Sequence, residues 1–187
     1  ATCRCVRSAD VDAAPAGRHG GVARALHWST ALLVIAMIPA GFSLLSLPPG
    51  PIQDAGFLLH RSTGVLLFVL TAVRLGWRLA HPPPPLPASV PAGQRAIAHV
   101  VHVALYALLF AMPLVGWWAT SAYGAPISVF GLFVLPPLVA QDRALAEQAF
   151  ALHGALGIAM AALIAAHAGA ALHHHFFKRD GVLRRML

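Results

Sequence analysis

The chain alternates long apolar stretches with short polar or proline-rich segments. A helix needs about 20 apolar residues to cross a bilayer, and four stretches reach that length: residues 25–47, 57–79, 98–120 and 150–177. The first two are followed by proline-rich segments, residues 48–51 and 82–85, which cannot continue a helix. The pattern therefore predicts an all-α protein whose fold is a transmembrane four-helix bundle.

The remaining segments are shorter. Residues 121–139 are apolar but interrupted by proline and glycine, which predicts an interfacial or re-entrant loop instead of a fifth span. Residues 1–23 are predicted to form an N-terminal tail, and residues 24–187 a single four-helix domain. Cys3 and Cys5 in the tail are too few for a disulfide framework and lack further zinc ligands nearby, so we interpret them as incidental thiols.

The composition agrees with a membrane protein. Hydrophobic residues make up 58% of the chain and charged residues only 10%, whereas a soluble domain is about a quarter charged. A net charge of +7 in a soluble protein would suggest nucleic acid as a partner. Here the basic residues lie at the ends of apolar stretches, where they act as topology signals. We therefore expect the lipid bilayer as a partner and no nucleic acid.

Lysine and arginine are distributed unevenly between the two sides of the predicted bundle. Cytoplasmic loops of membrane proteins are enriched in these residues. Eleven of the 13 fall on one side of a four-span arrangement: Arg4, Arg7, Arg18, Arg24, Arg74, Arg78, Arg95, Lys178, Arg179, Arg184 and Arg185. Only Arg61 and Arg143 fall on the other side. Four spans with both termini in the cytoplasm reproduce this distribution, whereas three or five spans do not.

Histidines carry the candidate chemistry. The chain has 11 of them, most in or beside apolar stretches, where ionisable groups are costly and are functional candidates. His153 and His167 are 14 residues apart, so they leave one face of the fourth helix about 21 Å apart. His60 opens the second span at the depth of His153. His27 opens the first span and is the natural partner of His167, although their depths match less closely.

Two imidazoles facing each other across a bundle favour haem iron over zinc. Zinc takes about four ligands, commonly including thiolate or carboxylate, and the four stretches contain no Cys, Asp or Glu. Two axial histidines fill both open positions of a haem iron, which favours electron transfer over oxygen binding. His99 and His102, which open the third span, remain rival ligands of the inner site or contacts for a quinone or haem propionate.

Three other residues can each be interpreted in two ways. Arg74 lies 14 residues after His60 and either pairs with a haem propionate or extends to the inner interface. Gly41 and Gly116, each 14 residues after a histidine, either make room for a flat macrocycle or serve helix packing. The run of histidines at positions 173–175 is interpreted as interfacial, not as a ligand cluster.

Longer motifs extend over nearly the whole chain. They are Ala25-Leu26-His27-Trp28, Leu59-His60-Arg61-Ser62-Thr63-Gly64, Arg74-Leu75-Gly76-Trp77-Arg78, Ala98-His99-Val100-Val101-His102, Ser128-Val129-Phe130-Gly131, and the C-terminal residues from His174 to Leu187. In these motifs the chain resembles the bacterial cytochrome b561 family, close to the b-type cytochrome subunits of nickel hydrogenases. The resemblance covers about residues 24–187.

The resemblance implies a di-haem cytochrome of the bacterial cytoplasmic (inner) membrane. Its motif positions imply that His27, His60, His153 and His167 are the axial ligands of two haems b, so that these four histidines bind the haem iron. The residues beside them, Arg61, Arg74, His99 and His102, are then contacts for haem propionates or quinone. The implied activity is that of an electron-transfer oxidoreductase which exchanges electrons with ubiquinone.

The resemblance leaves the electron donor open. One branch of the family oxidises superoxide at the periplasmic face and reduces ubiquinone. In this chain the predicted outer loops carry two arginines against three acidic residues, Asp54, Asp142 and Glu147. This charge gives no bulk steering of an anion, although Arg61 beside His60 remains available for local guidance.

Three functions are compatible with these features. The first is an oxidoreductase that passes electrons from a one-electron donor to quinone. The second is a haem-bearing anchor subunit that links a partner dehydrogenase or hydrogenase to the quinone pool. The third, a histidine-lined metal transporter, is disfavoured because the spans contain no carboxylates.

Overall fold

A computed structural model describes residues 17–85 and 90–187. Its elements in chain order are α1 (Gly21–Leu44), α2 (Pro51–Ala80), α3 (Ala92–Tyr123), β1 (Ile127–Val129), β2 (Phe133–Leu135), α4 (Arg143–His173), the π-helical turn η1 (His174–Lys178) and the 3₁₀ turn η2 (Leu183–Arg185). Four of the described helices are long and apolar enough to cross a membrane. The predicted all-α, four-helix transmembrane fold is confirmed, and Cys3 and Cys5 lie outside the described residues.

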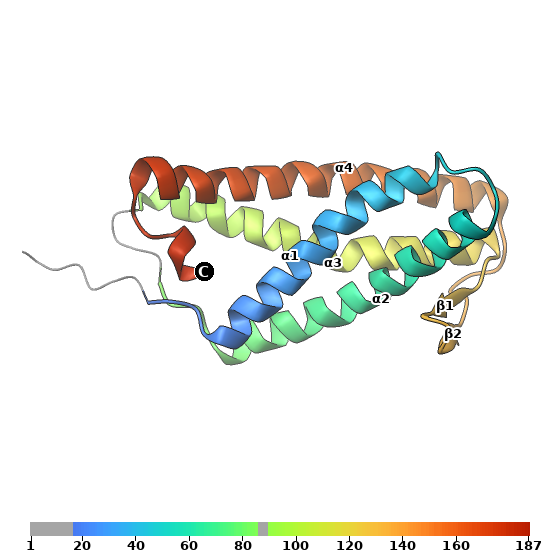
Figure 1. Cartoon of the computed structure of the whole chain (residues 1–187), viewed down its shortest axis with the longest axis horizontal. Coiled ribbons are helices and arrows are strands. Elements are labelled where there is room, and N and C mark those ends of the chain that lie inside the picture. Colours follow the sequence, from blue (N-terminus) through green and yellow to red (C-terminus); the bar gives the residue numbers. More distant parts are fainter. Residues whose placement is uncertain (1–16, 86–89) are drawn as a thin grey trace, which may run out of the picture.

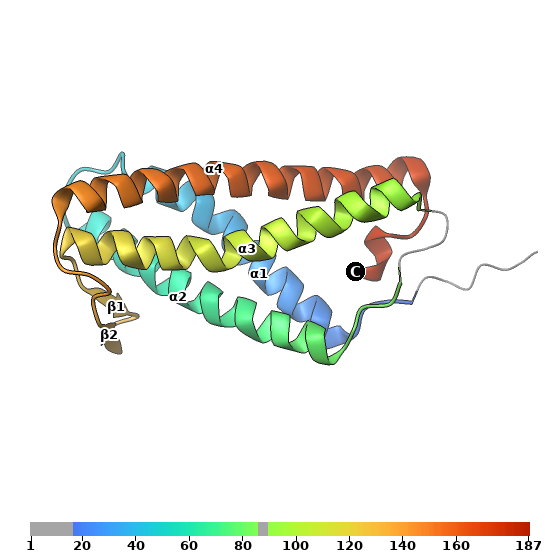
Figure 2. The same cartoon turned by 180° about the vertical axis from the view of Figure 1, so that it is seen from behind.

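The four long helices run between two ends of the molecule (Figure 1). We call one the hairpin end, because it carries β1 and β2 together with the α1–α2 loop. We call the other the terminal end, because η2 and the start of α1 meet there. Figure 2 shows α3 and α4 side by side, with α1 crossing the bundle obliquely. The closest backbone packing is between α3 and α4, followed by α1 with α2 and α2 with α3.

The helices extend beyond the apolar stretches seen in the sequence. Pro51, expected in a loop, is the first residue of α2, where proline's missing N–H costs nothing. Helix α4 begins at Arg143, seven residues before its apolar stretch, and the Asp142 carboxylate caps it by accepting from the Leu145 amide at 3.0 Å. Hydropathy marks only the lipid-facing part of a helix, so the polar turns at its ends escape it.

The segment between α3 and α4 forms a small antiparallel hairpin. Strands β1 and β2 pair with Val129 opposite Phe133, and the turn places Phe130 and Gly131 at positive φ. The buried Ser62 hydroxyl holds this hairpin against α2: it donates to the Ser128 carbonyl at 3.1 Å and accepts from the Phe130 amide at 2.8 Å. The prediction that this segment is not a fifth span is confirmed.

The core lies midway along the bundle and takes one residue from each long helix: Val34, Leu67, Leu109 and Met160. Elsewhere large apolar side chains face outward, as Leu32 does at 65% exposure and Ile158 at 63%. A bundle in lipid needs no polar exterior, and this exterior is the apolar surface that a bilayer covers.

Candidate functional site

One pair of histidines meets near the hairpin end. His60 from α2 and His153 from α4 have ring centroids 6.2 Å apart, with their planes inclined by 72°. Both rings are half-buried, and both Nδ1 atoms are buried without a hydrogen-bond partner among the described residues. Buried polar atoms are nearly always paired. Two orphaned imidazole nitrogens at the same depth therefore mark a place built for something other than packing.

Glycines line this pair on both sides. A Cβ added to Gly41 of α1 would lie 2.9 Å from Cε1 of His60, and a Cβ on Gly116 of α3 would lie 3.1 Å from Cε1 of His153. No real Cβ makes contacts as short as the first. Each imidazole therefore lies against the backbone of a neighbouring helix, and any larger residue at Gly41 would force the His60 ring to shift. Gly41 and Gly116 each contact a histidine of the pair. From the sequence, helix–helix packing was the alternative role for both glycines.

A second group of histidines lies near the terminal end. His27 of α1 and His167 of α4 have ring centroids 6.3 Å apart at 69°. His102 of α3 is closer to His167, at 5.1 Å. All three rings are half-buried, whereas His99 is exposed on α3. The structure thus brings His102 to the group and leaves His99 outside it.

The centroid distances can be compared with those of imidazoles that share one metal. A metal–imidazole nitrogen bond is about 2 Å, and the ring centre lies about 1 Å behind that nitrogen, so imidazoles on opposite sides of a metal have centres about 6 Å apart. The His60–His153 and His27–His167 separations agree with this distance. The His102–His167 separation is about 1 Å too short. The donor sets therefore fit an iron with two axial histidines in each group.

Arg74 lies within the terminal-end group. Its guanidinium donates to Nδ1 of His27 at 2.8 Å and covers the ring of Tyr106 at 5.2 Å from the ring centroid. Arg74 therefore lies at the end of the bundle that its spacing from His60 predicted. Tyr106 was not singled out in the sequence, because a tyrosine in an apolar helix has no distinguishing pattern.

Arg61 contacts the segment before β1 and an aromatic ring of its own helix. Its guanidinium donates to the Pro126 carbonyl at 2.8 Å and lies over the Phe57 ring. In this structure Arg61 therefore ties the hairpin to α2, as its neighbour Ser62 does. A hydroxyl two residues after a candidate ligand in an apolar helix was the signal that could have pointed to Ser62.

The two groups are separate sites held by one helix. His153 and His167 are 14 residues apart on α4, about 21 Å along its axis, and the apolar core lies between them. The helix pairs that supply the histidines, α1 with α4 and α2 with α4, make little close backbone contact. Within residues 17–85 and 90–187, no three His, Cys, Asp or Glu side chains are grouped to hold a metal ion by themselves.

Comparison with known proteins identifies relatives of this chain. The model of a family described as prokaryotic cytochrome b561 matches residues 18–187. A protein described as cytochrome b561 homolog 2, from Escherichia coli, is 40% identical over 173 residues, which cover 91% of each chain. Cytochrome b561 homolog 1 of the same organism is 34% identical and covers 87% of this chain and 92% of its own. A Yersinia pestis protein described as "probable superoxide oxidase CybB" is 31% identical, covering 87% and 91%.

Proposed function

Because the chain belongs to the prokaryotic cytochrome b561 family, we propose that it is a di-haem cytochrome which passes electrons between a one-electron donor and membrane quinone. Family and fold together make it a multi-pass bacterial membrane protein and a b-type cytochrome of electron transfer. The proposal adds the number of haems, their ligands, the quinone and the location in the cytoplasmic membrane with both termini inside.

The observation that carries the proposal is the pair of histidine separations near 6 Å at opposite ends of one bundle. His60 and His153 are the proposed ligands at the hairpin end, and His27 and His167 those at the terminal end. Haem iron supplies reversible one-electron chemistry, and two axial histidines leave it no open position for oxygen. The short His102–His167 separation supports a neighbouring role for His102, beside the iron ligands.

The hydrogen bond between Arg74 and His27 is compatible only with a His27 ring that does not bind iron through Nε2. The hydrogen bond from Arg74 makes Nδ1 of His27 an acceptor and places the ring proton on Nε2. Ligation through Nε2 requires the proton on Nδ1 instead. If His27 holds a haem iron through Nε2, Arg74 would give up this hydrogen bond, and its guanidinium would be available to a haem propionate.

The chain's own residues also place an apolar core between the two sites. Val34, Leu67, Leu109 and Met160 fill the centre of the bundle. A dry, apolar centre offers no path for protons, so electrons can pass along the bundle without accompanying proton leakage.

The relatives and the position of the sites support a proposed donor and acceptor. One relative is described as a "probable superoxide oxidase", so we propose superoxide as a candidate donor at the hairpin end. We propose quinone as the acceptor, because two sites at different depths suit a reaction that exchanges electrons with a lipid-soluble carrier. Arg61 is engaged with the Pro126 carbonyl, so local guidance of an anion by Arg61 requires that this bond opens.

The test is a haem count by pyridine haemochrome, with a reduced-minus-oxidised visible spectrum, on purified protein. About two haems b per chain are expected from the two ligand pairs. His27→Ala and His60→Ala should each lose one haem, because each removes one of two axial ligands. His99→Ala is the matched control: this histidine is exposed and should leave both haems in place.

His102→Ala separates the rival ligands. Retention of both haems in His102→Ala agrees with the proposed pairs. If His102→Ala loses one haem and His27→Ala loses none, His102 and not His27 is the ligand at the terminal end. A purified protein with no haem would overturn the proposed function. Turnover of superoxide and ubiquinone by the isolated chain would support a stand-alone oxidoreductase, and a stoichiometric partner dehydrogenase would favour the anchor-subunit alternative.

A further inference from the structure

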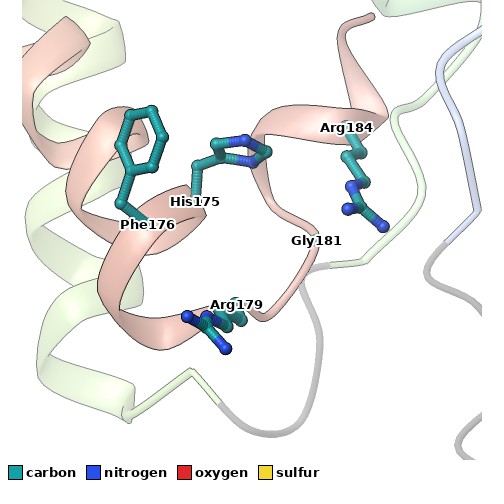
Figure 3. A pocket seen from close by; sticks show the side chains of 5 residues that line it. All are labelled: His175, Phe176, Arg179, Gly181 and Arg184. Atoms are coloured by element: carbon teal, nitrogen blue, oxygen red, sulfur yellow. The ribbon is translucent and has the colours of Figure 1, made fainter.

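A basic pocket lies at the terminal end, away from the histidine pairs. It has a volume of about 280 Å³ and is lined by His175 and Phe176 of η1, Arg179 and Gly181 of the following turn, and Arg184 of η2 (Figure 3). The chain reverses there because Arg179 and Gly181 both adopt positive φ, 52° and 78°. The reversal brings η2 back against η1, so that the guanidinium groups of Arg179 and Arg184 and the imidazole of His175 line one space.

Among the described residues, no carboxylate pairs with the pocket's guanidinium groups. The ion pairs between described residues are Arg143 with Glu147 and His174 with Asp180, and neither involves Arg179 or Arg184. Asp180 is the acidic residue in the reversal, but its oxygens are already engaged: they accept from the His174 ring and from the Val182 amide. Two exposed arginines therefore face the pocket with their charge uncompensated.

The surroundings place the pocket at the edge of a bilayer. Phe176 is 63% exposed and Phe177 78%, directly after the apolar length of α4. Aromatic side chains exposed at this position are suited to lipid. One wall of the pocket is thus an exposed phenyl ring, and the other walls carry positive charge. An occupant that matches both must be anionic at one end and apolar at the other.

We propose that this pocket binds the phosphate headgroup of an anionic phospholipid, with Arg179 and Arg184 on the phosphate and Phe176 against the glycerol and acyl region. Guanidinium groups bind phosphate oxygens with paired hydrogen bonds, and basic pockets at the ends of transmembrane helices are typical lipid headgroup sites. The chemistry of the phosphate is shared by free inorganic phosphate, but only a lipid also uses the exposed phenylalanine wall.

Binding at this pocket has a structural consequence for the C-terminal segment, residues 182–187. The segment after Gly181 also packs against the start of α1, where the Trp28 indole N–H donates to the Met186 carbonyl at 2.7 Å and the His19 amide donates to the Arg185 carbonyl at 3.1 Å. A bound phosphate neutralises the charge that Arg179 and Arg184 bring together. It would therefore stabilise residues 182–187 in their position across the terminal end of the bundle.

The experiment is native mass spectrometry of the haem-loaded full chain in mild detergent with equal amounts of phosphatidylglycerol and phosphatidylcholine. The unaltered protein should retain phosphatidylglycerol preferentially. Arg179→Gln and Arg184→Gln should each weaken that retention about fivefold, since one basic residue near a lipid surface contributes about that factor. Lys178→Gln is the matched control, because it removes an adjacent exposed charge that does not line the pocket.

Three results would overturn the proposal. One is equal loss in Lys178→Gln, which would reduce the effect to general surface charge. Another is equal retention of the two lipids by the unaltered protein, a comparison that needs no variant to fold. The third is displacement of the lipid by millimolar inorganic phosphate with no need for acyl chains, which would make this a free-anion site. An unchanged haem spectrum in each variant shows that folding is intact.

Discussion

Single residues decide how closely the helices approach the imidazoles. Gly41 and Gly116 lie against the rings of His60 and His153, and a methyl group on Gly41 would lie 2.9 Å from a ring carbon. The His60 ring is half-buried, so an added methyl group would displace it from the position that faces His153. Glycine weakens a helix interior relative to alanine, so helix stability does not explain a glycine at position 41. The contact with the His60 ring does explain it.

Gly41→Ala should weaken haem retention at the hairpin end. Overpacking a well-packed place costs about 1–3 kcal/mol, which corresponds to a loss of affinity of about 5-fold to about 150-fold. Haem content during dilution into haem-free detergent, measured by the visible spectrum, checks this. Gly76→Ala is the control, because a Cβ there meets nothing within 4 Å. Equal haem loss from the two variants would contradict the proposed role of Gly41.

At the scale of elements, one short hydrogen-bonded connection positions the hairpin beside a proposed ligand. Ser62 is fully buried, and its hydroxyl donates to the Ser128 carbonyl in β1 and accepts from the Phe130 amide in the turn after β1. Arg61, one residue earlier, bonds to the carbonyl of Pro126 just before β1. The β1–β2 hairpin therefore depends on the same turn of α2 that carries His60.

Ser62→Ala should loosen the hairpin without removing a proposed ligand. It leaves the Phe130 amide and the Ser128 carbonyl without their partner, at a cost of about 1–3 kcal/mol. For a chain of this size each kcal/mol lowers the melting temperature by about 2–4 °C. Thermal unfolding in detergent, together with proteolysis within residues 130–132, checks this.

Ser43→Ala serves as the comparison, because its exposed hydroxyl bonds only to Pro39 of its own helix. If Ser62→Ala unfolds at the same temperature as Ser43→Ala, the hairpin is held by its apolar contacts instead. Buried Ile127 and Val129 would then be the residues to substitute next.

For the whole molecule, the described chain ends, the end of α2 and the start of α3 lie at one end, and the hairpin lies at the other (Figure 1). The basic residues follow this division: Arg18, Arg24, Arg78 and Arg95 belong to the terminal end together with the cations of η1 and η2. The positive-inside rule then places the terminal end in the cytoplasm. This orientation is a prediction about the molecule as a unit, since no single helix has a direction by itself.

Thiol labelling in spheroplasts tests the orientation. In a Cys3→Ser, Cys5→Ser background, Glu147→Cys at the hairpin end should react with a membrane-impermeant maleimide in intact spheroplasts. Gln94→Cys, near the start of α3, should react only after the membrane is opened. Both positions are exposed. Labelling of Gln94→Cys in intact spheroplasts, with Glu147→Cys protected, would reverse the orientation and place the His60 site on the cytoplasmic side.

The sequence by itself determined the number of spans and the spacing of the histidines on α4. Apolar length and the 3.6-residue period are local properties, so they can be read along one helix without knowing its neighbours. Two imidazoles 14 residues apart must leave the same face of α4 wherever α4 lies. The same local character explains why the polar ends of α2 and α4 were missed: they are helical by capping and proline placement, not by hydropathy.

Only the tertiary structure decided which side chains meet between helices. The distance between His27 and His167, the shorter distance between His102 and His167, and the contact of Gly41 with His60 depend on how the four long helices cross and where they lie beside one another. The reversal after η1, which creates the basic pocket, likewise brings together residues whose sequence showed only a positively charged tail. Spacing along one helix fixes depth and face, but it leaves the distance to another helix free, and that distance is set by packing.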